Sequence, residues 1–334
     1  MKLDIHTSSI EPRRQTYAHV ARRLGDRPAS RYDEAVLDVQ ATANFHYRPL
    51  WQPDREIYDV RRTAVVLEDW YVLRDPRQLY YGTYNLSRAA MDQGTERALA
   101  FIEQRGLLAA VAPSWLASVA SYLLPLRHYE WGANMNAMTV ADYGYGTAIT
   151  SAAAFSAIDR LGMAQTLGKI GLLLDPTGDV LDRAKASWLE APFWQPIRHA
   201  LEDTFVLEDW FEAFVAQNVA LDGAVHRLVY RAFDRAGMDH GAAAISMATG
   251  FMTEWMPDHA RWVDAVVEKA AAASPENRAL LSGWARKWSA RAVEAARPLA
   301  ERVLGGDAAA AVDRVAAEAA DRAERLGLER EAAR

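Results

Sequence analysis

The chain has 334 residues, 51% of them apolar, which is enough to bury a large core in one or two domains. Its net charge of -6 gives no sign of a nucleic-acid-binding surface, and the lack of cysteine excludes disulfides, thiolate metal sites and cysteine nucleophiles. The first residues lack the apolar stretch of a signal peptide, and Pro113 and Pro125 interrupt the longest uncharged run, 107–126. We therefore expect a soluble, cytoplasmic protein that neither binds nucleic acid nor spans a membrane.

Residues 1–60 differ in composition from the rest of the chain. They are rich in arginine, tyrosine, histidine and proline, and strong helical periodicity is lacking. Large aromatic and arginine side chains on an irregular segment suit an arm that wraps a partner, and the alternative is a tail folded over its own core. The candidate interface residues in this arm are Tyr17, Arg22, Arg23, Tyr47, Arg48 and Trp51.

From Asp75 onward the sequence predicts helices. Asp75 followed by Pro76 is a typical helix start, and Ser274-Pro275 predicts another start, with Gly305 ending that helix near residue 304. Between them we expect helices over about 114–143, 147–161, 163–174, 181–190, 193–221, 223–235 and 240–272. Because alternating strand patterns are lacking, the predicted class is all-α, with a bundle over 61–272 and extra C-terminal helices over 273–334. The last helix is charged, rich in alanine and predicted to be peripheral.

One short repeat stands out. Val-Leu-Glu-Asp-Trp occurs at 66–70 and again at 206–210, with unrelated flanks that favour coincidence over duplication. In both copies we expect the acidic residues near the start of a helix, where the helix dipole favours them.

Metal-binding and catalytic motifs are missing from the sequence. Helical bundles often hold two metals with Glu-x-x-His pairs, but no acidic residue here has a histidine three positions later. The single reversed pair is His199-x-x-Glu202, which alone cannot make a site. Nucleophile elbows, phosphate-binding loops and dinucleotide fingerprints are also lacking.

Several long segments resemble one family. RRQTYAHVARRLGDRPASRYDEA, NFHYRPLW, PLRHYEWGANMN, DRLGMAQTLGKIGLLLD, FWQPIRHALEDT and DWFEAFVAQN closely resemble the β (small) subunit of the hydroxylase in bacterial multicomponent phenol hydroxylases. Toluene and methane monooxygenases are more distant relatives. The resemblance covers about residues 8–260 and implies a ferritin-like (ribonucleotide reductase-like) bundle without the metals of the catalytic α subunit.

The resemblance also implies a degenerate di-iron site. Where catalytic relatives carry carboxylates, this chain is aligned with Thr83, Pro125, Gln217 and Met256, while His128 and His259 remain. Two iron ions need anionic oxygen ligands, so this set should not hold them, and the two histidines are interpreted as buried and hydrogen-bonded. A slip of one turn would bring Glu130 or Glu254 into consideration, but neither has a histidine at the required spacing. Kinks are expected at Pro125 and Pro257.

By resemblance, the chain is a non-catalytic structural subunit of an NADH-dependent aromatic monooxygenase. It would pair with a large di-iron α subunit and a small γ subunit in an (αβγ)2 hydroxylase. A regulatory protein and a reductase carrying FAD and an iron–sulfur cluster would associate with that complex. The alternatives are the β subunit of a toluene, alkene or propane monooxygenase, an enzyme with its own di-iron centre, and an unrelated helical interaction module. The substrate cannot be read from this chain, because its pocket would lie in the α subunit.

Overall fold

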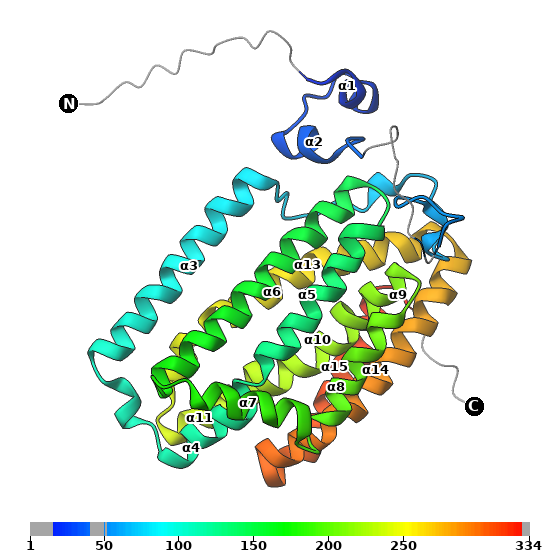
Figure 1. The fold of residues 1–334 in the computed structure, drawn as a ribbon. Coiled ribbons are helices and arrows are strands. Elements are labelled where there is room, and N and C mark those ends of the chain that lie inside the picture. The colour runs from blue at the N-terminus through cyan, green and yellow to red at the C-terminus, as the bar shows by residue number, and fades with distance from the viewer. Residues whose placement is uncertain (1–15, 41–49, 51, 329–334) are drawn as a thin grey trace, which may run out of the picture.

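The chain forms a bundle of long helices with a small helical lobe at one end. The computed structural model describes residues 16–40, 50 and 52–328, and within these ranges every regular element is helical, which confirms the predicted all-α class. Figure 1 shows the long helices lying side by side, with α1 (Ala18–Leu24) and α2 (Arg31–Val36) beyond one end. In the described part of the chain, no helix has the length and apolar character that crossing a bilayer would require.

The described part of the N-terminal arm contains two short helices joined by irregular segments. Ser30 begins α2 with a capping box, in which its hydroxyl accepts from the Asp33 amide and the Asp33 carboxylate accepts from the Ser30 amide. Tyr32 and Val36 of α2 are buried against Ala148 at the start of α6 (Thr147–Leu174). Residues 16–40 therefore pack on the chain's own bundle, as in the alternative interpretation of the arm.

The first half of the bundle contains α3 (Tyr81–Gln104), α4 (Pro113–Ser118), α5 (Leu126–Tyr143), α6, α7 (Asp179–Glu190) and α8 (Gln195–Glu202). The predicted start at Asp75 is wrong, because Gln78 adopts a left-handed φ of 53° and the helix begins only at Tyr81. The predicted helix over 114–143 is divided, with a π-helical turn, Val119–Leu123, before Pro125 at the N-cap of α5. Residues 147–174 form one helix, since Gly162 does not break it.

The second half of the bundle is built around one nearly continuous helical run. It consists of α9 (Trp210–Val215), π-helical η6 (Ala216–Leu221), α10 (Asp222–Val225), π-helical η7 (His226–Phe233) and α11 (Asp234–Gly237). The expected helix over 193–221 instead ends with α8 and the 3-10 turn η5 (Asp203–Val206), because Asp209 caps a new helix. A short helix, α12 (Ala243–Ala248), precedes α13 (Gly250–Ala273), which contains Pro257.

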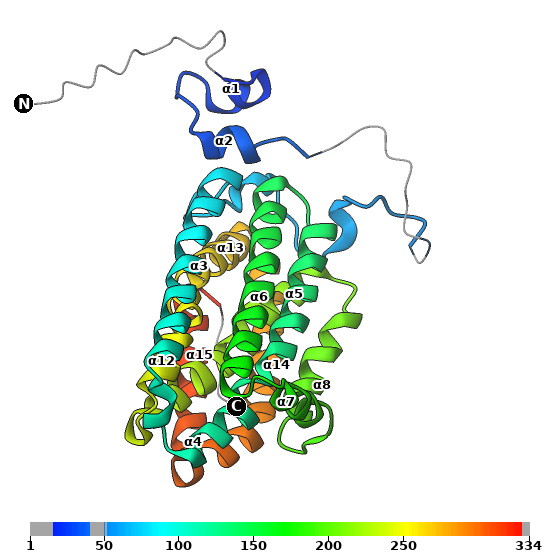
Figure 2. The same ribbon diagram turned by 60° about the vertical axis from the view of Figure 1, so that its left-hand side comes forward.

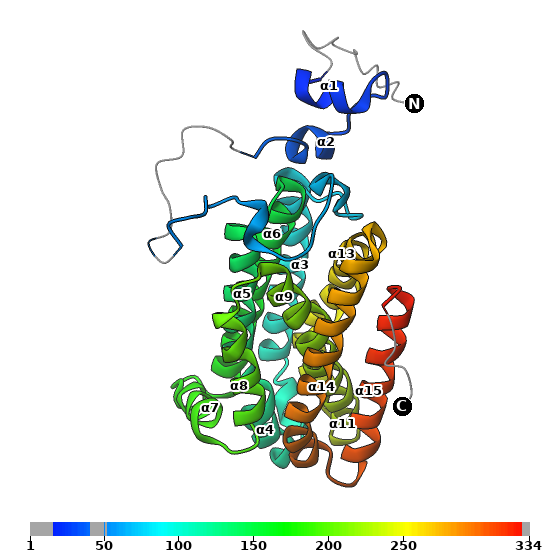
Figure 3. The same cartoon turned by 90° about the vertical axis from the view of Figure 1, so that its right-hand side faces the viewer.

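The C-terminal helices follow the prediction closely. Ser274 caps α14 (Pro275–Leu304) by accepting a hydrogen bond from the Asn277 amide, and Gly305 ends the helix with a φ of 55°. The last helix, α15 (Ala308–Arg325), packs along α14. Figure 3 shows this pair on the opposite side of the molecule from α5 and α6.

The two copies of the repeated pentapeptide lie against each other. Asp69 caps the 3-10 turn Trp70–Val72 and Asp209 caps α9, which confirms that both acidic residues stand at helix starts. The rings of Trp70 and Trp210 are 5.8 Å apart in the core, next to Phe214. The repeat therefore marks two capped turns that share one aromatic cluster.

Candidate functional site

The structure does not bring the six predicted metal-remnant positions together. The Thr83 hydroxyl lies in the first turn of α3, where it accepts a hydrogen bond from the Tyr80 amide at 3.1 Å. Pro125 and His128 lie at the start of α5, which begins at the end of the bundle opposite to the start of α3 (Figures 1 and 2). Grouping these three with Gln217 and His259 in one site was therefore wrong.

His128 packs at the edge of the bundle rather than at its centre. Its ring stacks 6.3 Å from Trp188 of α7, and its Nε2 atom has no hydrogen-bond partner among the described residues. Burial, helped by the nearby charges of Arg127 and Lys185, lowers the pKa of His128 to about 4. The imidazole is neutral at neutral pH and acts as an aromatic packing residue.

Gln217 and His259 do lie in the centre. The His259 ring is fully buried, stacks 4.1 Å from Trp255, and places Nε2 2.9 Å from Oδ1 of Asn218. The hydrogen-bond partner of His259 is therefore Asn218 of η6. Met256, one turn earlier on α13, is only half-buried and lines a surface groove.

A buried arginine occupies the middle of the bundle. Arg160 of α6 donates from Nη1 to Oε2 of Glu130 on α5 at 2.8 Å, and from Nη2 to the carboxylate of Asp222 on α10. All three side chains are almost fully buried, and the guanidinium lies 4.5 Å above the Trp255 ring. We call Glu130, Arg160 and Asp222 the ionic centre.

Neutral donors complete the hydrogen bonding of the two carboxylates. The Tyr230 hydroxyl donates to Glu130 at 3.1 Å, and the Tyr129 hydroxyl donates to Asp222 at 2.8 Å. Gln217 Nε2 donates to the same Asp222 oxygen at 2.9 Å, while its Oε1 accepts from Asn136. These bonds satisfy the lone pairs that burial would otherwise leave unpaired.

A second buried ion pair lies beside the first. Asp159 of α6 accepts from both guanidinium nitrogens of Arg88 on α3 at 2.8 Å. The Tyr84 hydroxyl and the Trp255 indole nitrogen donate to the same carboxylate, at 2.9 and 2.6 Å. Helices α3, α5, α6, α10 and α13 are thus tied together through charged side chains rather than through apolar contacts alone.

Burial and charge oppose each other in the ionic centre. Burial raises the pKa of Glu130, and Arg160 counteracts that shift. Burial alone would lower the pKa of Arg160, but Asp222 and Glu130 outweigh it and raise that pKa. Burial also raises the pKa of Tyr129 and Tyr230 well above the usual value, so both hydroxyls remain donors.

The residues of the ionic centre do not fit a di-iron site. The space between the two carboxylates is taken by a guanidinium, whose positive charge would repel a metal cation. Of the histidines beside it, His226 Nε2 lies 3.2 Å from the Met252 carbonyl and His259 Nε2 faces Asn218, which leaves His259 Nδ1 as a single buried nitrogen without a partner. In residues 16–40, 50 and 52–328, no group of three or more acidic or histidine side chains is arranged to hold a metal ion.

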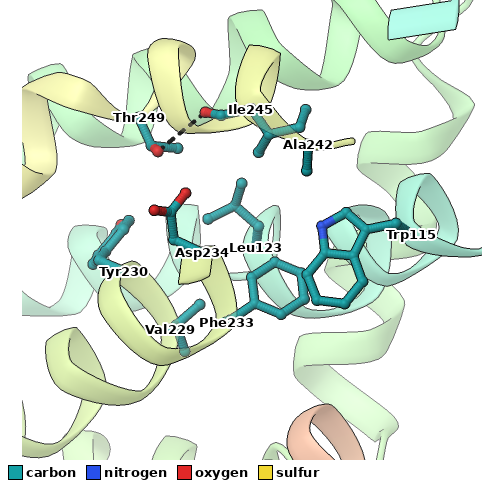
Figure 4. Close-up of a pocket in the computed structure, with 9 residues that line it drawn as sticks. All are labelled: Trp115, Leu123, Val229, Tyr230, Phe233, Asp234, Ala242, Ile245 and Thr249. Carbon is teal, nitrogen blue, oxygen red and sulfur yellow. Dashed lines mark hydrogen bonds between the residues drawn. The ribbon is translucent and has the colours of Figure 1, made fainter. Parts of the chain in front are cut away.

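The enclosed pocket beside Trp115 is too small for an organic substrate. Figure 4 shows a pocket between Trp115, Phe233 and Ile245 with a volume of about 10 Å³, the space of one water molecule. A surface groove of about 400 Å³ reaches Asp222 and His226 from outside, but the Asp222 carboxylate is already bonded to three partners. Neither space combines a free acid or base with room for a reacting molecule.

The arm residues predicted to contact a partner are only partly described. Tyr47, Arg48 and Trp51 lie outside the described residues. Tyr17 and Arg22 are exposed on and beside α1, whereas Arg23 is paired with Asp38 at 2.8 Å and with Asp69 of the bundle. Arg23 thus holds the lobe against its own chain, and the partner role of the others stays a prediction.

The sequence analysis missed Arg160, Asp159 and Asp222, and considered Glu130 only as an alternative. A signal was present, because α6 carries just three charged residues in 28, and Asp159 and Arg160 are adjacent in its middle. Charges inside an otherwise uncharged helix are expensive to bury unless they are paired. That pattern could have pointed to an internal ion pair.

Comparison with known proteins agrees with this architecture. Residues 51–274 match the Methane/Phenol/Alkene Hydroxylase family, and the chain belongs to that family. The oxygenase component DmpL of phenol 2-monooxygenase from Pseudomonas sp. (strain CF600) is 45% identical over 98% of both chains. The corresponding MhpL component from Acinetobacter pittii (strain PHEA-2) is 42% identical, also over 98% of both chains.

Solved structures extend the comparison to the fold. A chain of phenol hydroxylase from Pseudomonas sp. OX1 superimposes with a TM-score of 0.91 and 40% identity, covering 99% of this chain and 100% of that one. This match confirms the predicted ferritin-like bundle and the resemblance to phenol hydroxylase subunits. Toluene 4-monooxygenase gives a TM-score of 0.76 at 20% identity, with 86% and 97% of the two chains covered, which supports the fold alone.

Proposed function

We propose that this chain is the non-catalytic small subunit of the oxygenase component of a phenol hydroxylase. In that component it pairs with a large di-iron subunit, which inserts one oxygen atom of O2 into an aromatic ring. Electrons come from NADH through a separate reductase that carries FAD and an iron–sulfur cluster, and a regulatory protein and a small third subunit complete the assembly. The identities of 45% and 42% to phenol 2-monooxygenase components support this assignment.

The observation that carries the proposal is the ionic centre. A bundle that holds two metals needs carboxylates free to bind them, and here Glu130 and Asp222 are both bonded to Arg160. The Arg160 guanidinium supplies the positive charge that metal ions would otherwise supply between the carboxylates, but it cannot take part in redox chemistry. The described part of the chain therefore keeps a charged, hydrogen-bonded interior without a cluster of ligands for a metal that could activate oxygen.

The same interior suits a supporting role. Arg160 and Arg88 connect α3, α5, α6 and α10 through buried charge-assisted hydrogen bonds, which require defined geometry. A rigid neighbour helps to keep metal-bearing helices in place, because metal geometry tolerates little displacement. The chain then contributes to the reaction by keeping the metal-bearing helices of the large subunit in position.

A related assignment has weaker support. The β subunit of toluene-4-monooxygenase from Ectopseudomonas mendocina is 25% identical over 86% of this chain, and the propane 2-monooxygenase small subunit from Mycolicibacterium goodii is 24% identical over 81%. Both identities lie well below those to the phenol 2-monooxygenase components. Aromatic hydroxylation of the phenol type is therefore the favoured activity of the complete enzyme.

Reconstitution tests the proposal. The chain is produced alone and together with the large subunit of the same oxygenase component, and each preparation is assayed with the small third subunit, reductase, regulatory protein, NADH, O2 and phenol. We expect a stable complex and phenol oxidation only when the large subunit is present. Turnover by this chain without the large subunit, or failure of the two chains to co-purify, would overturn the proposal.

A further inference from the structure

The outward surface of α5 is apolar between Arg127 and Asp142. Trp131, Met135 and Met138 follow one another at helical spacing and form one stripe, with 56%, 41% and 41% of each residue exposed. At the side of this stripe, Phe205 of η5 packs against Gly132 and remains partly exposed. A soluble surface helix ordinarily carries charged side chains at such positions.

The outward surface of α6 continues this pattern. Ile158 is 54% exposed, Leu172 is 49% exposed and Leu161 between them is half-buried. Of the charged residues in α6, Asp159 and Arg160 point inward and only Lys169 is exposed. We call the outward side chains of α5 and α6 (Trp131, Met135, Met138, Ile158, Leu161 and Leu172) the α5–α6 face.

The two stripes form one continuous surface. α5 and α6 pack along most of their length, and Figures 1 and 2 both show them side by side. Soluble monomers rarely leave contiguous apolar patches larger than about 300–600 Å². A standard protein interface covers roughly 800 Å² per partner, and large, half-exposed apolar side chains along two long helices suit such a contact.

One of two glycines on α6 indicates a close neighbour. A Cβ atom at Gly162 or Gly168 would meet nothing within 4 Å, so packing inside the described chain does not require glycine at either position. Glycine inside a helix is less favourable than alanine, because it loses more conformational freedom on folding. Gly162 lines a groove with Tyr84 and Phe251 of this chain, so Gly168 is the position where a second helix approaching the α6 backbone closely would explain the glycine.

The adjacent helix α3 also lacks a partner on one side. It is 24 residues long but buries only Tyr84, Leu99 and Ile102, while Tyr81 and Leu86 are each 77% exposed. Helices of this kind depend on packing for their stability. Figure 2 shows α3 beside α6, so the uncovered surface extends from the α5–α6 face onto α3.

We propose that the α5–α6 face is the docking surface for the large subunit of the oxygenase component. This inference rests on the proposed function and adds where the partner binds. The occupant is an uncharged helical surface, because a charged one would be desolvated here without a counter-charge. The relatives named "subunit beta" and "small subunit" support a larger partner in the same component.

Charge substitutions test the surface. Ile158→Glu places a carboxylate on the α5–α6 face, and Met238→Glu is a matched control because both side chains are 54% exposed. Each variant is co-expressed with an affinity-tagged large subunit, and circular dichroism checks that it is folded. We expect recovery with the large subunit to fall by about tenfold or more for Ile158→Glu, equivalent to about 1.4 kcal/mol of binding energy, and to stay unchanged for Met238→Glu.

Hydrogen exchange in the wild-type complex gives an independent readout. Peptides covering 131–138 and 158–172 should exchange more slowly when the large subunit is bound, whereas α14 and α15 should not change. Normal recovery of Ile158→Glu with unchanged exchange in α5 and α6 would overturn the docking surface and leave the proposed function standing. A homodimer through this face that persists beside the large subunit would also overturn it. Failure of the wild-type chain to co-purify would instead contradict the proposed function.

Discussion

The helix pairs α5–α6 and α14–α15 distribute polarity in opposite ways. In α14 and α15 the buried residues are mostly apolar, such as Leu281, Trp288 and Val312, and the outward positions are rich in arginine and glutamate. In α5 and α6 the charged residues Glu130 and Arg160 are inside, while Trp131 and Ile158 are outside. The first pair follows the pattern of a surface in water. The second pair, α5 and α6, has charged residues inside and apolar residues outside. This is the region where the chain differs from a bundle that functions alone.

The largest expected effect comes from removing the central cation. Arg160→Met leaves the Glu130 and Asp222 carboxylates buried without a counter-charge, which should lower the free energy of unfolding by about 3–5 kcal/mol. Arg291→Met on α14 breaks a half-exposed ion pair with Asp203 and should cost about 1 kcal/mol or less. Chemical denaturation measures the free energy of unfolding of both variants. Equal losses would show that the helix pairs α5–α6 and α14–α15 do not differ in how strongly they depend on their ion pairs.

A combined variant identifies the cause of that loss. Adding Glu130→Gln and Asp222→Asn to Arg160→Met removes the unpaired charges while keeping the shapes of the side chains. We expect part of the lost stability to return. No recovery would mean that the cavity left by arginine, rather than uncompensated charge, dominates the effect.

Acid should destabilise the centre of the bundle. Burial lowers the pKa of His226 to about 4, so the unfolded chain takes up this proton near pH 6.5 and the folded chain only near pH 4. Unfolding therefore becomes easier as the pH falls through that range, by about 3 kcal/mol in total at about 1.4 kcal/mol per pH unit. Since α14 and α15 contain no histidine, this contribution comes from the central helices. Denaturation curves at several pH values should show it, and His226→Gln should make the dependence shallower, while the lowered pKa values of His128 and His259 keep the remainder.

A smaller effect is expected at the start of α14. Ser274 accepts a hydrogen bond from the Asn277 amide, so Ser274→Ala should lower the free energy of unfolding by about 1 kcal/mol. By contrast, α6 begins after Gly146 without a side-chain cap and depends on packing instead. Thermal unfolding measures the loss, and an unchanged midpoint would show that this cap is not needed.

The smallest expected effect comes from replacing a helical glycine by alanine. It distinguishes the stability of this chain from its assembly with the large subunit. Gly168→Ala in α6 and Gly283→Ala in α14 both place a methyl group in open space and should each stabilise the isolated chain by about 0.5–1 kcal/mol. Only Gly168→Ala should weaken co-purification with the large subunit. Equal behaviour of the two variants in the complex would contradict a close contact at α6.

The sequence predicted the fold better than the site. The long helices, the Ser274 cap and the end at Gly305 follow from local rules and are confirmed. The break before Asp209 was missed, and Pro125, where a kink was expected, divides the helix instead, because tertiary packing decides whether a helix continues past such residues. The resemblance identified the family correctly.

The centre of the site could not be read from local patterns. Gln217 and His259 were placed in it, but Thr83, Pro125 and His128 lie elsewhere. The pairing of Arg160 with Asp222 joins residues 62 positions apart, and no spacing rule along one helix predicts it. Glu130 was considered only as an alternative in case the alignment was shifted by one turn. A histidine three residues later on the same helix was sought as its partner, whereas an arginine on a neighbouring helix was not.

Metal analysis tests the central claim most directly. The assembled oxygenase component is loaded with Fe(II) without oxygen, the subunits are separated under non-chelating conditions, and the iron in each is measured. The account predicts iron in the large subunit and none above background in this chain, because Arg160 fills the space between Glu130 and Asp222. Stoichiometric iron in this chain, lost in a Glu130→Gln variant, would contradict it.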